Sequence, residues 1–125
     1  MNLIGITKRF MLVALLCTLL ASCTWEEIKP KKVTTPDSAK FSLNIIPIFN
    51  ANCAKSGCHI KGGQAPDLST QNAYTSLIYY GYIDVDFPAS SILYEKINTG
   101  SMKDKATDVD RALILKWIQQ GALDN

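Results

Sequence analysis

Two cysteines and the only histidine of this 125-residue chain stand within one short run, Cys53-Ala-Lys-Ser-Gly-Cys58-His59. This run constrains the fold through the spacing of its thiols. In a regular α-helix, positions i and i+5 lie about 140° apart around the axis. The two thiols would then point to different sides of the helix and could not both face one edge of a flat molecule. The segment between them is therefore expected to loop out. Gly57, directly before the second cysteine, is the residue best able to adopt the backbone angles of such a loop.

The residue types in this run are typical of covalent haem attachment. In a C-x-x-C-H motif the two thiols form thioethers with the haem vinyl groups, and the adjacent histidine ligates the iron. Cys53 and Cys58 are spaced two residues wider, in a C-x4-C-H variant, and His59 keeps its place after the second cysteine. The motif predicts one covalent haem c per chain, with His59 as the proximal ligand.

The N-terminus has the pattern of an export signal, because Lys8-Arg9 precede an apolar run at positions 10–21. At about a dozen residues this run is shorter than the ~20 that a membrane-spanning helix needs, so a transmembrane segment is the weaker interpretation. The tetrad Leu20-Ala21-Ser22-Cys23 resembles the bacterial lipobox. That resemblance implies a lipoprotein signal peptide over residues 1–22 and a lipidated first residue, Cys23, in the mature chain.

Lipid on Cys23 predicts a lipoprotein held on a membrane and facing the periplasm, since each buried CH₂ group contributes about 0.8 kcal/mol of anchoring. Thr24 stands where an Asp marks inner-membrane retention in some bacteria, which slightly favours the outer membrane. The alternative is a soluble secreted protein in which Cys23 is incidental.

Residues 23–40 are expected to be the lipidated cysteine and a linker, with prolines, mixed charges and no sustained apolar period. The globular domain is then 41–125. The whole chain has 13 Lys and Arg against 11 Asp and Glu, and loss of Lys8 and Arg9 with the signal leaves 11 against 11. This neutral balance gives no electrostatic case for binding nucleic acid.

Haem attachment leaves no cysteine unexplained, because Cys17 leaves with the signal and Cys23 carries lipid. Two alternatives remain open. An exported protein could join Cys53 and Cys58 in a disulfide. The second is a structural zinc site. Such a site takes four ligands, whereas the mature chain has only His59 and two unlipidated cysteines as candidates.

The domain shows four short helical patterns and no sustained period-2 pattern, which predicts an all-α fold. The expected helices cover residues 41–49, Thr70 to Tyr80, Ser91 to Asn98, and a last segment that begins at Thr107. In the first, Pro47 is tolerable if the helix begins only a residue or two before it.

Caps and stops are expected at the ends of these helices. Ser69 or Thr70 would cap the second and Gly81 would end it, while Ser90 is a candidate cap for the third. Thr107 and Asp110 resemble a capping box for the last helix. That helix is expected to end at Gly121 and to bury a face carrying Val109, Ala112, Leu113 and Trp117.

A domain of about 85 residues in short helices buries a small core and commonly needs a staple or cofactor, which a flat and mostly apolar haem would supply. A sixth iron ligand can be sought by elimination. Met1 and Met11 leave with the signal, so Met102 is the only methionine of the mature chain, and it stands among polar neighbours in an expected loop. Met102 is therefore the predicted distal ligand, and core filler is its alternative role.

The domain resembles small monohaem c-type cytochrome domains, particularly lipoprotein forms of Bacteroidetes-like bacteria. The resemblance runs from about Ile45 through Gly121. The segments that carry it are Ile46-Pro47-Ile48-Phe49, Asn52-Cys53, Cys58-His59, Gly63-Gln-Ala-Pro66-Asp-Leu68, Ser91-Ile-Leu-Tyr94 and Trp117-Ile-Gln-Gln-Gly-Ala122. One departure is that Lys103 follows Met102, where the family commonly has a proline.

The resemblance implies a cytochrome c-like bundle of about four short helices around one haem. It implies that the Pro66 carbonyl accepts the second N–H of His59, which would improve the imidazole as a ligand, and that Leu68 packs on the ring. It also implies that the last helix crosses the first and buries Trp117.

The expected function is single-electron transfer rather than catalysis, with redox proteins docking transiently at an exposed haem edge. Its first alternative is an iron site left open by Met102, which would serve a peroxidase or a gas sensor. The second is a haem-free lipoprotein module for adhesion or assembly.

Overall fold

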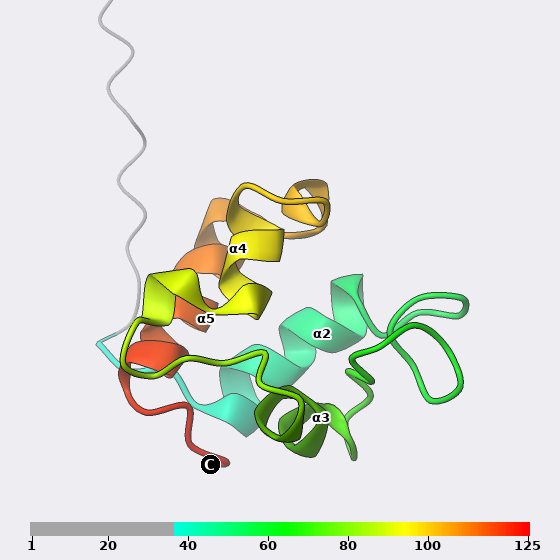
Figure 1. The fold of residues 1–125 in the computed structure, drawn as a ribbon, viewed down its shortest axis with the longest axis horizontal. Helices are drawn as coiled ribbons and strands as arrows, with labels where there is room; N and C mark the ends of the chain where they lie inside the picture. Colours follow the sequence, from blue (N-terminus) through cyan, green and yellow to red (C-terminus); the bar gives the residue numbers. More distant parts are fainter. Residues whose placement is uncertain (1–36) are drawn as a thin grey trace, which may run out of the picture. The chain divides into compact units, whose positions relative to one another are not determined.

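The computed structural model describes residues 37–125, so the predicted signal peptide, Cys23 and most of the predicted linker lie outside the described residues. The described part is helical and contains no strand (Figure 1), which confirms the all-α prediction. Its segments are a π-turn η1 (Phe41–Ile45), α2 (Ile46–Asn52), α3 (Ala73–Tyr79), a short 3₁₀ turn η2 (Pro88–Ser90), α4 (Ile92–Asn98), a second 3₁₀ turn η3 (Lys103–Lys105) and α5 (Asp108–Gln119). None of these helices is long and apolar enough to cross a membrane.

The first helical stretch accommodates Pro47 by changing its winding. The backbone from Phe41 to Ile45 is a π-turn, and α2 begins at Ile46, one residue before the proline. Proline has no N–H to donate, and its ring would press on the carbonyl four residues earlier in a continuing α-helix. The wider turn that precedes Pro47 lets one helical stretch run from Phe41 to the segment that begins at Cys53.

The first N–H groups of η1 are hydrogen-bonded to the last residue of the chain. The N–H groups of Phe41 and Ser42 donate to Oδ1 and the carbonyl of Asn125, each at 2.8 Å. Just before them, the Ala39 N–H donates to Oε1 of Gln120 at 2.7 Å, and Ala39 itself is buried. Long-range hydrogen bonds therefore satisfy N–H groups that no local side chain caps. Since Ala39 is buried, the packed structure includes residues before Phe41, where the domain was predicted to begin.

The predicted start of the second helix is wrong. It begins at Ala73 rather than Thr70, and neither Ser69 nor Thr70 caps it. The cause is a turn centred on Asp67, whose carboxylate accepts from the Ser69 N–H at 3.0 Å and from Nδ2 of Asn72 at 2.7 Å. This Asx-turn takes the chain through residues 69–72 before the helix forms. Gly81 follows the helix with φ +68°, as the predicted stop requires.

Helix α4 begins at Ile92, with Ser91 rather than Ser90 at the N-cap position. The Ser91 hydroxyl does not cap the helix. It accepts from the Asp84 N–H at 2.9 Å and donates to the Asp84 carbonyl at 3.1 Å, and Ser91 is buried. A tertiary contact to the preceding loop has therefore replaced the expected local cap.

The last helix is the one whose ends were predicted best. Thr107 and Asp110 form a complete capping box at its start, and Gly121 follows its end with φ +91°. The predicted buried face is wrong in part, because Val109 is exposed and the buried residues are Ile114, Trp117 and Ile118.

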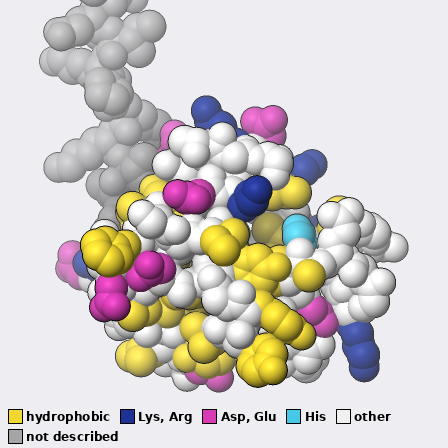
Figure 2. All heavy atoms as spheres, in the orientation of Figure 1, with side chains coloured by type: hydrophobic (Ala, Val, Ile, Leu, Met, Phe, Trp, Pro, Cys, Tyr) yellow, Lys and Arg dark blue, Asp and Glu magenta, His cyan; other side chains and the backbone are white. Residues whose placement is uncertain are grey.

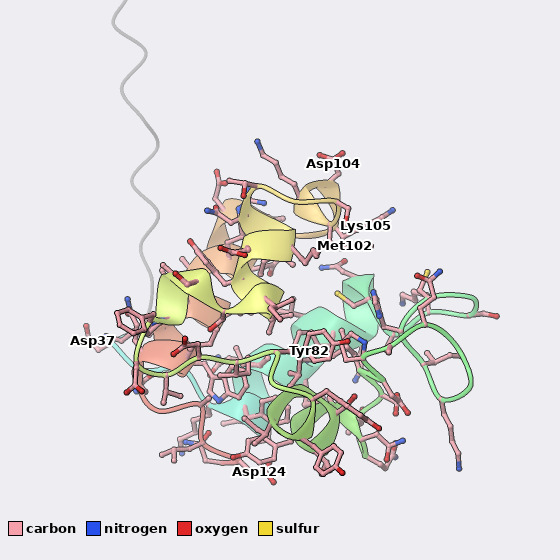
Figure 3. The ribbon with its side chains drawn as sticks, in the orientation of Figure 1. Asp37, Tyr82, Met102, Asp104, Lys105 and Asp124 are labelled. Carbon is pink, nitrogen blue, oxygen red and sulfur yellow. The ribbon has the colours of Figure 1, made fainter. Side chains whose placement is uncertain are left out.

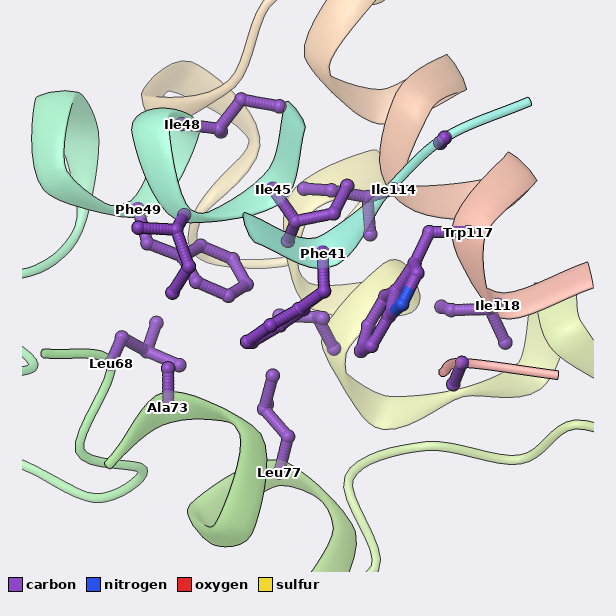
Figure 4. Close-up of a cluster of buried hydrophobic side chains, with 14 of the residues drawn as sticks. Phe41, Ile45, Ile48, Phe49, Leu68, Ala73, Leu77, Ile114, Trp117 and Ile118 are labelled. Atoms are coloured by element: carbon purple, nitrogen blue, oxygen red, sulfur yellow. The ribbon is translucent and has the colours of Figure 1, made fainter. Parts of the chain in front are cut away.

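The core lies where α5 packs against η1. The Trp117 ring lies against Phe41 with centroids 5.0 Å apart, and its Nε1 donates to the Leu123 carbonyl at 2.9 Å. Figure 4 shows these two rings at the centre, with Leu77 of α3 below them and Ile114 of α5 above. The implied burial of Trp117 against the first helix is confirmed, and one end of the core continues to Leu68.

Candidate functional site

The first helical stretch continues three residues beyond its predicted end at Phe49, and the Cys53–His59 segment then leaves the helix. Helix α2 ends at Asn52, and the chain then folds into a tight loop in which the Cys53 carbonyl accepts from the N–H groups of Lys55 at 2.9 Å and His59 at 3.2 Å. Gly57 has φ +77°, a conformation that residues with side chains rarely adopt. The prediction that the segment loops out at Gly57 is confirmed.

A second loop folds back on the first and fixes His59 between them. The Gln64 N–H donates to the Cys58 carbonyl at 2.8 Å, and the Leu68 N–H donates to the His59 carbonyl at 2.9 Å. Gly63 makes this return possible, because a Cβ at that position would lie 2.2 Å from the Cys58 carbonyl oxygen. Figure 1 shows the two loops extending away from the helices after α2.

The imidazole of His59 is held through one ring nitrogen. Its Nδ1 lies 3.1 Å from the Pro66 carbonyl oxygen and 3.3 Å from the Gln64 carbonyl oxygen. Both partners are acceptors, so Nδ1 carries the proton and donates it. In the neutral imidazole Nε2 then carries the free lone pair, and it has no hydrogen-bond partner among residues 37–125. The contact that the resemblance implies for Pro66 is present, while its role behind a metal ligand stays a prediction.

The two cysteines are free thiols in different surroundings. Cys58 is exposed, whereas Cys53 is half-buried beside the core. Burial raises the pKa of the Cys53 thiol, and the negative charges of Asp110 and of Cys58 as thiolate raise it further. Cys53 is therefore held in its protonated form at neutral pH, and the structure contains no Cys53–Cys58 disulfide.

A cavity of about 420 Å³ joins the predicted site residues. Its size falls within the roughly 300–1,000 Å³ that is usual for cofactor and small-molecule sites. Its lining includes Cys53, Cys58, His59, Pro66, Leu68 and Met102, together with apolar residues of α2, α4 and α5. All described residues that the sequence assigned to a haem therefore meet at one place. Figure 2 shows the histidine at the surface beside hydrophobic side chains.

Leu68 and Met102 lie in the cavity wall on different segments. Leu68 is buried at the junction between cavity and core. Met102 is half-buried in the connection between α4 and α5, and its N–H donates to the Lys96 carbonyl at 2.9 Å. Figure 3 shows Met102 close to Lys105 on this connection, far from Asp37 and Asp124. A thioether thus faces the same space as the imidazole.

Several polar residues of the lining, among them Tyr82, Lys96 and Lys105, were not predicted as site residues. Helical spacing could have indicated Lys96, since it shares a face of α4 with Leu93 and Ile97. Tyr82 reaches the cavity, whereas its neighbours Tyr79 and Tyr80 do not line it. Tyr79 and Tyr80 are exposed and pack on each other, with ring centroids 5.0 Å apart.

The side chains that line the cavity can be compared with what a bare metal ion and a covalently held haem would each need. Within residues 37–125, no three His, Cys, Asp or Glu side chains gather closely enough to hold a metal ion. A haem needs a different arrangement, namely two thiols, one imidazole with a fixed tautomer, an apolar wall and a soft ligand for the other axial position. Cys53, Cys58, His59, Leu68 and Met102 could supply these in one cavity.

Comparison of the chain with protein-family models, with curated protein sequences and with solved structures finds no significant match.

Proposed function

We propose that the chain is a monohaem c-type cytochrome that carries single electrons. In this proposal Cys53 and Cys58 form the thioethers, His59 is the proximal ligand and Met102 the distal ligand. The observation that carries the proposal is that these four side chains, from two loops far apart in the sequence, line one largely apolar cavity.

The haem, when bound, would supply an iron that alternates between the ferric and ferrous states. The chain's own residues would hold the iron ligands in place, so that little atomic movement accompanies the change between the ferric and ferrous states. The Pro66 carbonyl holds the proton on Nδ1 of His59, which leaves Nε2 as the nitrogen available to a metal. Ligation of the iron by the Met102 thioether together with the His59 imidazole would favour the reduced state, and so would raise the reduction potential relative to ligation by two imidazoles.

The electron would leave or enter at the mouth of the cavity, where the chain offers a surface for transient contact with redox proteins. Lys96 and Lys105 are both exposed and belong to the lining. We propose that lipid on Cys23 keeps this domain at a membrane facing the periplasm, with residues 24–40 as the tether. Electron transfer of this kind requires no general acid or base from the chain.

Haem attachment is tested by production together with a c-type cytochrome assembly system. The expected result is haem-dependent peroxidase staining that co-migrates with the protein on a denaturing gel. The pyridine haemochrome spectrum should report two thioethers in the native protein and one in each of the single variants Cys53→Ala and Cys58→Ala. Ser56→Ala, in the same loop, is the matched control and should keep both. Absence of the stain would contradict haem attachment. It would favour the alternative of a haem-free module in which Cys53 and Cys58 form a disulfide.

Distal ligation is tested separately on the ferric protein. A sulfur-to-iron charge-transfer band and a low-spin spectrum are expected, and both should be lost in Met102→Ala. A native protein that is high-spin and lacks the band would instead have an open iron site, as a peroxidase or a gas sensor requires.

A further inference from the structure

The loop that carries Met102 is bonded to a side chain of the next helix. Arg111 lies in the first turns of α5, and only 16% of its side chain is exposed. Its Nη2 pairs with the carboxylate of Asp108 one turn earlier on the same helix. The pairing orients the guanidinium, so that its other nitrogen, Nη1, turns to the main chain of the loop.

Nη1 donates to three backbone carbonyls. The acceptors are Ala106 at 2.6 Å, Lys103 at 3.1 Å and Ile97 at 3.4 Å. Two N–H bonds serve three acceptors, so one bond is shared, and the shortest goes to Ala106. Hydrogen bonds from a charged donor are about twice as strong as those between neutral groups.

These three carbonyls bracket Met102. Ile97 belongs to the last turn of α4, where carbonyls have no partner within the helix, and a cation there also suits the helix dipole. Lys103 directly follows Met102, and Ala106 ends the η3 turn. One guanidinium therefore joins the start of the loop, the residue beside Met102 and the end of the loop.

We propose that Arg111 is a positioning residue, which holds the 99–106 loop so that the Met102 thioether faces the cavity. This inference rests on the proposed function. Residues 99–106 contain no proline to restrict the backbone, and a bonded guanidinium can restrict it instead. Lysine could keep the charge but not the planar fork of donors.

The test uses Arg111→Gln, with Arg111→Lys as the conservative variant and Gln120→Ala as the matched control. Gln120 follows the same helix and bonds to the backbone of Ala39, away from the Met102 loop. The first readout is tryptic cleavage after Lys103 and Lys105, which lie within the loop and need its local opening. Cleavage is expected to become about tenfold faster in Arg111→Gln, to be partly restored in Arg111→Lys and to be unchanged in the control.

The second readout is the sulfur-to-iron band of the ferric protein. With haem still attached, Arg111→Gln should lose this band at a lower temperature than the native protein and Gln120→Ala should not. If cleavage is unchanged in Arg111→Gln, Arg111 does not hold the loop. If cleavage rises while the band is retained equally, Arg111 does not position Met102. A native chain without haem stain, in which Arg111→Gln still accelerates cleavage, contradicts the proposed function and leaves the loop contact supported.

Discussion

Around Cys58 and His59, two glycines allow the chain to fold as it does, one through its backbone conformation and the other through its lack of a side chain. Gly57 was predictable, because the spacing of Cys53 and Cys58 demands a loop and glycine tolerates its positive φ. Gly63 was not, because its need for hydrogen in place of a side chain comes from the return of the chain onto the Cys58 carbonyl. Close approach between segments is a tertiary property, and no local spacing encodes it.

The different surroundings of the two thiols predict different reactivity in haem-free, reduced protein. The thiolate is the reacting form, and a raised pKa together with partial burial makes Cys53 slower than the exposed Cys58. Iodoacetamide at pH 8 should therefore label Cys58 first. Peptide mapping by mass spectrometry at increasing times measures both rates, with Cys58→Ser as the control for assigning them. Equal rates would mean that Cys53 is not protected.

Asp67 predicts a pH dependence of stability. Hydrogen bonding from Ser69, then from Asn72, and the charge of Lys61 lower the pKa of Asp67 from 3.8, and desolvation opposes this only in part. A folded-state pKa below the unfolded value stabilises the protein at neutral pH, and this contribution is lost as pH falls through the folded pKa. The free energy of unfolding should therefore be lower for Asp67→Asn than for the native protein at pH 7.

The gap in unfolding free energy between the two proteins should narrow below about pH 4, where the carboxylate is protonated first in the unfolded chain and then, at lower pH, in the folded protein. Urea unfolding at several pH values measures it. Asp124→Asn, which changes an exposed carboxylate near the C-terminus, is the control for net charge. A gap that stays constant down to pH 2 would show that the turn does not depend on the charge of Asp67.

Among the helices, agreement with the sequence depends on whether the ends are set locally. Helix α5 was predicted well because its capping box lies within four residues of one segment. Helices α3 and α4 were predicted less well, because Asp67 and Ser91 use their polar atoms in turns and loop contacts. The start of η1 at Phe41 agrees with the predicted helix, but the partner of its first N–H group could not be predicted, since it lies on Asn125. Local propensity yields to tertiary contacts at these ends.

The capping box of α5 predicts a measurable loss in Thr107→Ala. Its side chain accepts from the Asp110 N–H at 3.2 Å, and Oδ2 of Asp110 accepts from the Thr107 N–H at 2.9 Å. Loss of such a cap costs about 1 kcal/mol of unfolding free energy, or roughly 4–8 °C in Tm for a domain of this size. Ser90→Ala is the matched control, because Ser90 caps no helix. Thermal unfolding followed by circular dichroism measures both, and a Thr107→Ala midpoint within 2 °C of the native value would contradict the prediction.

Across the whole domain, the core and the cavity form one continuous structure. Leu68 and Ile114 belong to the core cluster and also line the cavity. The sequence indicated the all-α class, the burial of Trp117 and the thin core, since these follow from residue patterns. It could not indicate that α4 forms a cavity wall, because that depends on how short helices pack at a distance.

This continuity predicts that the domain depends on the proposed haem for stability. Without haem, the apolar walls of a cavity of about 420 Å³ lie next to the core and meet water. The same chain, produced with and without the c-type assembly system, provides a comparison in which no residue differs. The haem-free form should melt at least about 15 °C lower, which corresponds to roughly 3 kcal/mol for a small domain. It should also bind an apolar dye such as ANS, which exposed apolar surface attracts.

Met102→Ala with haem attached should melt between the haem-bound and haem-free native forms, because it removes one proposed iron contact and leaves the cavity filled. Coincident melting of the haem-bound and haem-free forms would show that the cavity is stable when open, and that the domain folds without support from a cofactor.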